Sequence, residues 1–224
     1  MEREWKRACR LLLVDSDLGR RATLSVALGK RGMVETAATP DEAIACAVTT
    51  PFDLAVLDAA VLGRDLPRLV RILRGRSRTV ALVVVAARRD LRGRHYAATL
   101  GVEAVLGRPT PAHALLDRIA AALAPPGDEW APFDRAVARA IDLLARDVTN
   151  LLDVSTLTEA TGVPLARLTE RFRAVTGLGV REYVTRVRVA IAEQLLRNTD
   201  LGVRTLAELL GLRGIDELAV LTVR

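Results

Sequence analysis

Short apolar runs alternate with amphipathic segments through the first half of the chain, and this alternation limits the possible folds more than any other feature. The runs at residues 10–15 and 52–58 both end in an aspartate. Uninterrupted apolar runs of about four to eight residues are typical of strands that helices cover on both faces. Repeated strand–helix units of this kind predict a doubly wound parallel sheet, and therefore an α/β domain. The five expected strands are residues 10–15, 34–37, 52–58, 79–86 and 103–106, and the expected helices are 18–30, 40–48, 67–73, 91–100 and 111–123.

Candidate site residues follow these expected strands at one edge of the sheet. Parallel strands all end on the same side, and binding sites in doubly wound sheets lie there. Asp15 and Asp58 end the first and third strands, Ala86 ends the fourth, and Arg108 follows the fifth. We therefore expect these side chains to meet at one site.

The segments LLLVDSD, FDLAVLD and GVEAVLGRP, with their spacing, resemble the receiver domain of two-component response regulators over residues 10–124. The resemblance implies that Asp58 accepts a phosphoryl group and that Asp15 and Asp58 bind a magnesium ion. Magnesium prefers oxygen ligands, and it offsets the charge that builds on the phosphoryl oxygens. The resemblance also implies a partner, either a sensor histidine kinase or another regulatory protein.

Several positions of the expected pocket depart from the receiver pattern. The pair of acids after the first strand is replaced by Asp15 and Ser16, with Asp17 one place later. The hydroxyl residue that would hold the phosphoryl group is Ala86. The lysine before the proline is Arg108, which keeps the positive charge but changes its shape and reach.

An arginine at position 108 can pair with Asp58 and hold the pocket closed without a metal. We therefore expect a degenerate receiver domain that serves for docking or dimerisation and requires no cofactor. Phosphotransfer to Asp58, with magnesium, is the alternative. The resemblance implies a homodimer formed through residues 102–123, the last helix and the sheet edge. The apolar residues expected to contribute there are Leu115, Ile119 and Leu123.

The second half of the chain contains two expected short helices joined by a glycine turn. Ser155 or Thr156 can cap the first helix, and Gly162 turns the chain. Pro164 suits the first turn of the next helix, which Gly177 closes. The pattern predicts a helix-turn-helix unit, whose second helix fits the major groove of DNA, although any small helical hairpin would share it. The expected apolar face of the second helix consists of Leu165, Leu168 and Phe172.

The same pattern is repeated further along the chain. Residues 156–172 align with residues 205–221, which places Gly162 and Gly211 in equivalent positions. One long helix is expected between the two units. The arrangement over residues 132–224 resembles the DNA-binding domain of AraC-type transcription regulators. The resemblance implies that each recognition helix enters the major groove of double-stranded DNA, with about 34 Å between the two.

The first unit offers the residues best suited to DNA. Glu170 could accept a hydrogen bond from cytosine, and Ala166 or Thr169 could contact a thymine methyl group. Arginines are better suited to phosphates, which position a protein without specifying sequence. The expected phosphate contacts are Arg167, Arg173, Arg181 and Arg186.

The second unit departs from the AraC pattern. Its expected recognition helix, residues 215–223, carries Asp216 and Glu217 and no base near its exposed face. DNA phosphates would repel these acids. We therefore expect a second unit that is degenerate and short at its C-terminus. The leading expectation is a dimeric bacterial transcription regulator whose receiver-like domain supplies signal input or dimerisation. Because Glu170 stands where the family has a basic residue, a protein-interaction module that has lost DNA binding is the alternative.

Charge alone is weak support for DNA binding. The net charge is +6, but residues 1–124 hold 20 basic and 13 acidic residues, whereas residues 125–224 hold 13 and 14. A local cluster of arginines is better support than the total. The expected domains are residues 1–124 and 132–224, with a linker at 125–131.

Other function classes find little support in the composition. Cys9 and Cys46 are isolated, and two histidines are too few for a zinc cluster. Because no catalytic set is evident, we expect a protein that is not an enzyme. The longest apolar run, residues 80–87, is too short to cross a membrane. The charged start of the sequence lacks an apolar signal core, which favours the cytoplasm.

Overall fold

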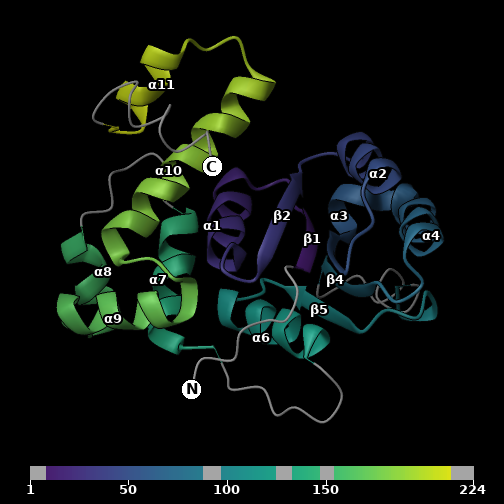
Figure 1. Cartoon of the computed structure of the whole chain (residues 1–224), viewed down its shortest axis with the longest axis horizontal. Helices are drawn as coiled ribbons and strands as arrows, with labels where there is room; N and C mark the ends of the chain where they lie inside the picture. Colours follow the sequence, from purple (N-terminus) through teal and green to yellow (C-terminus); the bar gives the residue numbers. More distant parts are fainter. Residues whose placement is uncertain (1–8, 88–96, 125–132, 147–153, 213–224) are drawn as a thin grey trace. The chain divides into compact units, whose positions relative to one another are not determined.

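A computed structural model of the chain describes residues 9–87, 97–124, 133–146 and 154–212. The chain forms two compact units (Figure 1). The sheet unit comprises Met1–Asp17 and Arg31–Phe133, and the helical unit comprises Leu18–Lys30 and Asp134–Arg224. The division at residue 133 lies close to the expected linker. The grouping of residues 18–30 with the C-terminal helices was not predicted from the sequence.

The sheet unit is built on five parallel strands in the order β2-β1-β3-β4-β5. The expected five-stranded parallel sheet is therefore confirmed, and every strand begins and ends within two residues of its expected bounds. The strands are β1 (Cys9–Val14), β2 (Gly32–Ala37), β3 (Leu54–Asp58), β4 (Ala81–Ala87) and β5 (Ala104–Arg108).

Helices cover this sheet within its own unit. The four-residue helix α3 and the 3-10 helix η1 were not predicted, because such short elements show no apolar periodicity. The helix expected at residues 91–100 lies partly outside the described residues, and residues 97–99 of it are helical. The described helices of the sheet unit are α2 (Pro40–Thr49), α3 (Ala59–Leu62), η1 (Gly63–Asp65), α4 (Leu66–Arg76) and α6 (Ala112–Leu123).

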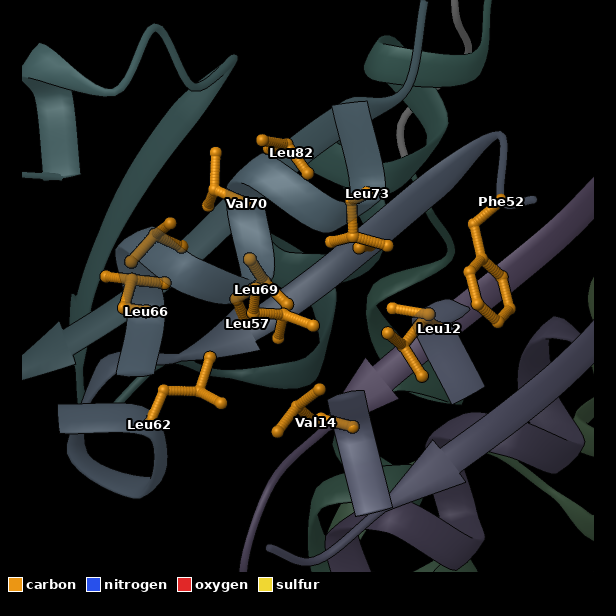
Figure 2. Close-up of a cluster of buried hydrophobic side chains, with 14 of the residues drawn as sticks. Leu12, Val14, Phe52, Leu57, Leu62, Leu66, Leu69, Val70, Leu73 and Leu82 are labelled. Atoms are coloured by element: carbon orange, nitrogen blue, oxygen red, sulfur yellow. The ribbon is translucent and has the colours of Figure 1, made fainter. Parts of the chain in front are cut away.

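The core of the sheet unit lies on both faces of the sheet. On one face, Leu12, Leu57 and Leu82 of the strands pack with Leu69 and Leu73 of α4 (Figure 2). Successive residues of a strand point to opposite faces, and their neighbours are buried too. Parallel sheets require such cover on both sides. The opposite face buries Leu11, Leu13, Leu54, Val56 and Val83.

Helix α6 uses its apolar side chains inside the monomer. It packs against β3 and β4, and Leu115 and Ile119 are only 1% and 0% exposed. The expectation that these two side chains contribute to a homodimer is therefore wrong, because a side chain buried in its own chain cannot contact a partner. Leu123, at the end of α6, is half-buried.

The helical unit brings one early helix together with the C-terminal helices. Helix α1 packs against α7, α9 and α10. Val137 and Ile141 of α7, Phe172 of α9, and Tyr183 and Ile191 of α10 are all buried. The helices are α1 (Leu18–Leu28), α7 (Arg135–Arg146), α8 (Val154–Thr161), α9 (Leu165–Thr176), α10 (Val180–Asn198) and α11 (Val203–Leu209).

Helices α8 and α9 form the expected hairpin, with two differences in detail. Gly162 connects them with φ of 67°, and its N–H donates to the Thr158 carbonyl oxygen. Helix α8 begins at Val154, so Ser155 and Thr156 lie inside its first turn. The expectation that either residue caps the helix is therefore wrong.

The apolar face of α9 is narrower than expected. Leu168 and Phe172 are fully buried, but Leu165 is 36% exposed because it is the first residue of the helix. Gly177 ends α9 in the left-handed conformation, as expected. Gly211 follows α11 with a similar positive φ. The helix expected at residues 215–223 lies outside the described residues, so the second helix-turn-helix unit stays a prediction.

None of the described helices combines the length and apolarity needed to span a membrane.

Candidate functional site

Two acids lie side by side at the carboxyl ends of the central strands. In the register of β1 and β3, Val14 pairs with Leu57. The next residue on each strand is an aspartate, so Asp15 and Asp58 occupy adjacent positions on the same edge. Both are buried, with 4% and 1% of their surface exposed. Asp15 and Asp58 therefore lie close together at the carboxyl ends of β1 and β3.

Arg108 connects these two acids from the end of β5. Its Nη2 atom donates to Asp58 Oδ2 and lies 3.1 Å from Asp15 Oδ2. The pairing of Arg108 with Asp58 that the sequence predicts is present. The contact between Arg108 and Asp15 was not predicted, because sequence spacing does not show which carboxylates an arginine will reach. One guanidinium nitrogen thus bridges two carboxylates, and the arginine side chain is 32% exposed.

Each carboxylate uses its other oxygen to hold the local backbone. Asp58 Oδ1 accepts from the Ala60 N–H at 2.9 Å, which makes Asp58 the N-cap of α3. Asp15 Oδ1 accepts from the Asp17 N–H at 3.0 Å. A backbone bond and a contact with Arg108 therefore help to fix each of the two side chains.

This arrangement does not fit the magnesium ion that the receiver resemblance implies. Magnesium requires several oxygen ligands, but the oxygens of Asp15 and Asp58 that face each other already contact Arg108 Nη2. Among the described residues, no group of three or more His, Cys, Asp or Glu side chains could hold a metal. In the described part of the chain, Arg108 supplies the positive charge that contacts both acids.

The other expected pocket residues lie around this centre. Ser16 and Asp17 are exposed in the two-residue connection that follows Asp15. Ala86 is fully buried near the end of β4, where its register partner is Gly107. A methyl group there offers no hydrogen bond to a phosphoryl oxygen.

The outer face of α9 presents most of the residues expected to contact DNA. Ala166, Arg167, Glu170 and Arg173 are exposed, whereas Thr169 is half-buried. A methyl group built on Gly179 would lie 3.4 Å from the Thr169 Cγ2 atom and 3.7 Å from the Arg173 Nε atom. Glycine at 179 therefore leaves room for both side chains over the start of α10.

The arginines of this region differ in their surroundings. Arg171 Nη1 lies 3.5 Å from Asp134 Oδ2, so this arginine pairs within its own unit. Arg181 is exposed at the start of α10. Arg186 is half-buried one turn and a half further on, and its Nε atom is buried.

Polar contacts from α1 hold α10, the helix that follows α9. The Tyr183 hydroxyl donates to the Thr23 carbonyl oxygen at 2.5 Å, and its ring packs edge-on against Phe172 with centroids 5.1 Å apart. Arg21 Nε donates to Gln194 Oε1 at 3.0 Å, with both side chains buried. Complete burial raises the pKa of the Tyr183 phenol well above its ordinary value.

The strand order and the acids at the strand ends place the sheet unit in one structural class. The order β2-β1-β3-β4-β5, with the site outside the carboxyl ends of β1 and β3, is the flavodoxin-like doubly wound arrangement that receiver domains share. The sheet unit is therefore receiver-like.

Comparisons with known proteins concern this half of the chain. No protein-family profile and no curated protein matches the chain. Matching solved structures include a CheY-like response regulator receiver domain protein from Methanospirillum hungatei JF-1, 23% identical with a TM-score of 0.45, where 50% of this chain and 91% of that chain are covered. The non-phosphorylated HemR receiver domain from Leptospira biflexa is 24% identical, with a TM-score of 0.47 and coverage of 55% and 99%. Chemotaxis protein CheY4 from Vibrio cholerae is 22% identical, with a TM-score of 0.46 and coverage of 52% and 100%.

Proposed function

We propose that this chain is a DNA-binding transcription regulator of the response-regulator type. The observation that carries the proposal is the outer face of α9, a helix that follows a tight glycine turn and rests on a buried apolar face. Arg167 and Arg173 on this face suit DNA phosphates, and Ala166 and Glu170 suit base edges in the major groove. A homodimer would bring two such helices to one DNA site and raise the affinity.

The receiver-like unit is proposed to act without aspartyl phosphorylation. The Asp58 carboxylate, which would have to attack a phosphoryl donor, is buried and bonded on one oxygen to Arg108 and on the other to the Ala60 N–H. Whichever oxygen attacked the phosphoryl donor would first have to give up its bond to Arg108 or to the Ala60 N–H. The unit then serves in docking or dimerisation, with Arg108 in place of a metal.

Selection of bound duplexes from a random DNA library tests the proposed function. We expect the purified chain to enrich a motif, and a homodimer to enrich two half-sites. Glu170→Ala should change the preferred base at one position of each half-site, because a side chain that reads a base edge determines that base. Enrichment of no motif by the wild-type chain contradicts sequence-specific DNA binding.

Titrations with the selected duplex separate phosphate contacts from base contacts. Arg173→Ala should weaken binding about three- to fivefold on every duplex and lower the log–log salt slope by about 0.9, as expected for one lost phosphate contact. Arg139→Ala is the matched control, because Arg139 is exposed on α7 of the same unit. Equal effects of the two substitutions would remove Arg173 from the interface.

The phosphorylation part of the proposal is tested by intact mass. The chain is incubated with acetyl phosphate and magnesium and then weighed. We expect no phosphoryl adduct on the wild-type chain. An adduct that disappears in Asp58→Ala would show that the site is an active phosphoacceptor.

A protein-interaction module is the second candidate function. The exposed carboxylate of Glu170 favours it, because an acid on the outer face of α9 repels phosphates. If the chain is such a module, neither the wild-type chain nor the Glu170→Gln variant should bind DNA. The same selection experiment therefore decides between the two candidates.

A further inference from the structure

The proposed function leaves one strongly charged surface of the sheet unit unexplained. Five arginines lie along α4 and in the loop that follows it, and residues 66–87 contain no acid. We call this set the α4 arginine surface. Four of the five are exposed, and the third is half-buried. Its members are Arg68, Arg71, Arg74, Arg76 and Arg78.

The helical period explains how these arginines are arranged. The buried side of α4 is formed by Leu66, Leu69, Val70 and Leu73. At about 100° per residue, Arg68 and Arg71 then project from the opposite, outward side. Arg74 and Arg76 lie on the two flanks of the helix, and Arg78 follows its last turn.

Backbone carbonyls hold the two flanking arginines in place. Arg74 Nη2 donates to the Gly101 carbonyl oxygen at 2.7 Å, and Arg76 Nη2 donates to the Thr49 carbonyl oxygen at 3.2 Å. A carbonyl is neutral, so these bonds orient the guanidinium groups and leave their charge uncompensated. A guanidinium has further N–H donors, which stay available to an anion.

Acids near the α4 arginine surface are few. Thr49 and Gly101 each precede a strand, so Arg74 and Arg76 lie at the amino end of the sheet. Arg68 lies in the first turn of α4, where Asp65 directly precedes the helix. In the described part of the chain, the acids at the amino end are Asp53, which accepts from the Arg10 N–H, and Glu103, which is exposed. Among the described residues, no carboxylate lies within ion-pair distance of any of the five arginines.

We propose that the α4 arginine surface binds the phosphate backbone of nucleic acid. Arg68 and Arg76 are separated by about 12 Å along the helix axis, at 1.5 Å per residue. Duplex DNA presents about seven phosphate charges over that length. The positive side chains therefore match a partner with closely spaced charges better than a single anion. This surface is separate from α9 and does not depend on the proposed function of that helix.

A lipid surface is a poorer match for the same arginines. Binding to a membrane surface combines basic residues with apolar side chains that enter the headgroup layer. Of the large apolar side chains that are exposed in the described part of the chain, only Val48 belongs to α2 or α4. Within α4 itself, Leu66, Leu69, Val70 and Leu73 are buried, and Ile72 is half-buried against the same core.

The test measures binding of the full chain to a 30-base-pair duplex of arbitrary sequence over a range of salt concentrations. The variant Arg68→Gln/Arg71→Gln should weaken binding about tenfold at low salt and lower the log–log salt slope by about 2, because two phosphate contacts are lost. The control Arg118→Gln/Arg139→Gln removes the same charge from α6 and α7, where both arginines are exposed. It should leave the slope unchanged.

The possible results separate this proposal from its rivals and from the function of α9. Equal slopes for the two double variants, or no effect of either, would overturn the proposal. So would loss of binding to phosphatidylcholine/phosphatidylglycerol vesicles in Arg68→Gln/Arg71→Gln with unchanged DNA binding. If α9 does not read DNA sequence, the selection experiment enriches no motif. If the α4 arginine surface does not bind phosphates, the salt slope of Arg68→Gln/Arg71→Gln equals that of the control. Circular dichroism of all variants excludes unfolding as the cause.

Discussion

Arg108 holds the strand ends of the sheet unit together through one nitrogen atom. Its Nη2 contacts both Asp15 and Asp58, and both acids are buried. Removal of Arg108 takes one positive charge from between two buried carboxylates, and losing one partner of a buried ion pair costs more than the original pair stabilises. A guanidinium in this position therefore acts structurally whether or not the site also receives a signal.

We expect Arg108→Ala to lower the free energy of unfolding of the sheet unit by about 2–3 kcal/mol. The double variant Asp58→Asn/Arg108→Ala should be more stable than Arg108→Ala alone, because the amide removes the uncompensated charge. Chemical denaturation followed by circular dichroism measures both values. Arg118→Ala, an exposed arginine on α6, serves as the control and should change stability by less than about 0.5 kcal/mol. If the changes in unfolding free energy caused by Asp58→Asn and Arg108→Ala simply add, the two side chains do not stabilise each other.

Tyr183 makes the stability of the helical unit depend on alkaline pH. Burial raises the pKa of its phenol above the value of about 10 that the unfolded chain has. The unfolded state therefore releases its proton first, so stability is full below pH 10 and falls as pH rises further, by up to about 1.4 kcal/mol per pH unit.

Tyr183→Phe tests this pH dependence. It should cost about 1 kcal/mol at pH 7 through the lost hydrogen bond to Thr23. Between pH 10 and 11.5 the variant should lose less stability than the wild-type chain. Denaturation curves at several pH values provide the measurement, and parallel losses in the two proteins would contradict the role of the buried phenol.

The residues of the sheet-unit site could be predicted in part from the sequence. Asp15, Asp58 and Arg108 follow apolar runs, and parallel strands bring such positions to one edge. The bond from Arg108 to Asp15 could not be predicted, because it depends on the reach of a long side chain across two intervening strands. The cap that Asp58 provides for α3 was missed for a similar reason: a four-residue helix has no periodicity to recognise.

At the scale of elements, α4 combines a buried apolar side with an arginine-rich outward side. Gly75 lies on the outward side near the helix end, and a methyl group built there would meet no atom within 4 Å. Its φ is not positive, so glycine is not required by the backbone. Its presence lowers the stability of the helix without a packing reason.

Gly75→Ala should therefore stabilise the sheet unit by about 0.5–1 kcal/mol, since alanine restricts the unfolded chain and favours the helix. Thermal or urea denaturation gives the value. Gly63→Ala is the contrasting variant, because the φ of 48° at Gly63 disfavours any other residue and the same change should destabilise. If both substitutions stabilise the sheet unit, or both destabilise it, the backbone conformation at the two glycines does not determine the effect of alanine.

Helix α1 shows why some element packing escapes prediction. Its periodic apolar residues predict a helix at the right place, but its buried set also includes Arg21 and Thr23. Arg21 is bonded to Gln194, 173 residues away. Such polar contacts between distant segments leave no periodic trace in the sequence. The assignment of α1 to the helical unit therefore requires the three-dimensional structure.

The whole molecule is not a simple tandem of two segments. The helical unit takes Leu18–Lys30 from between β1 and β2, so its chain is discontinuous. Without α1, residues 134–224 would expose the buried surfaces of α7 and α10 that α1 covers, together with the hydroxyl of Tyr183. Buried apolar area is the main source of stability, and a small unit that loses one packed helix is marginal.

Two fragments of the helical unit provide the last test. Residues 134–224 alone should unfold with little cooperativity and show weak hydrogen-exchange protection in α7 and α10. The same fragment with residues 18–30 attached through a flexible glycine–serine linker should unfold cooperatively, because α1 again packs on both helices. Residues 134–224 fused through the same linker to a scrambled 18–30 sequence serve as the control for length and composition. If residues 134–224 alone unfold as cooperatively as the fusion, α1 is dispensable for the helical unit, and the units would then follow the continuous boundaries that the sequence predicts.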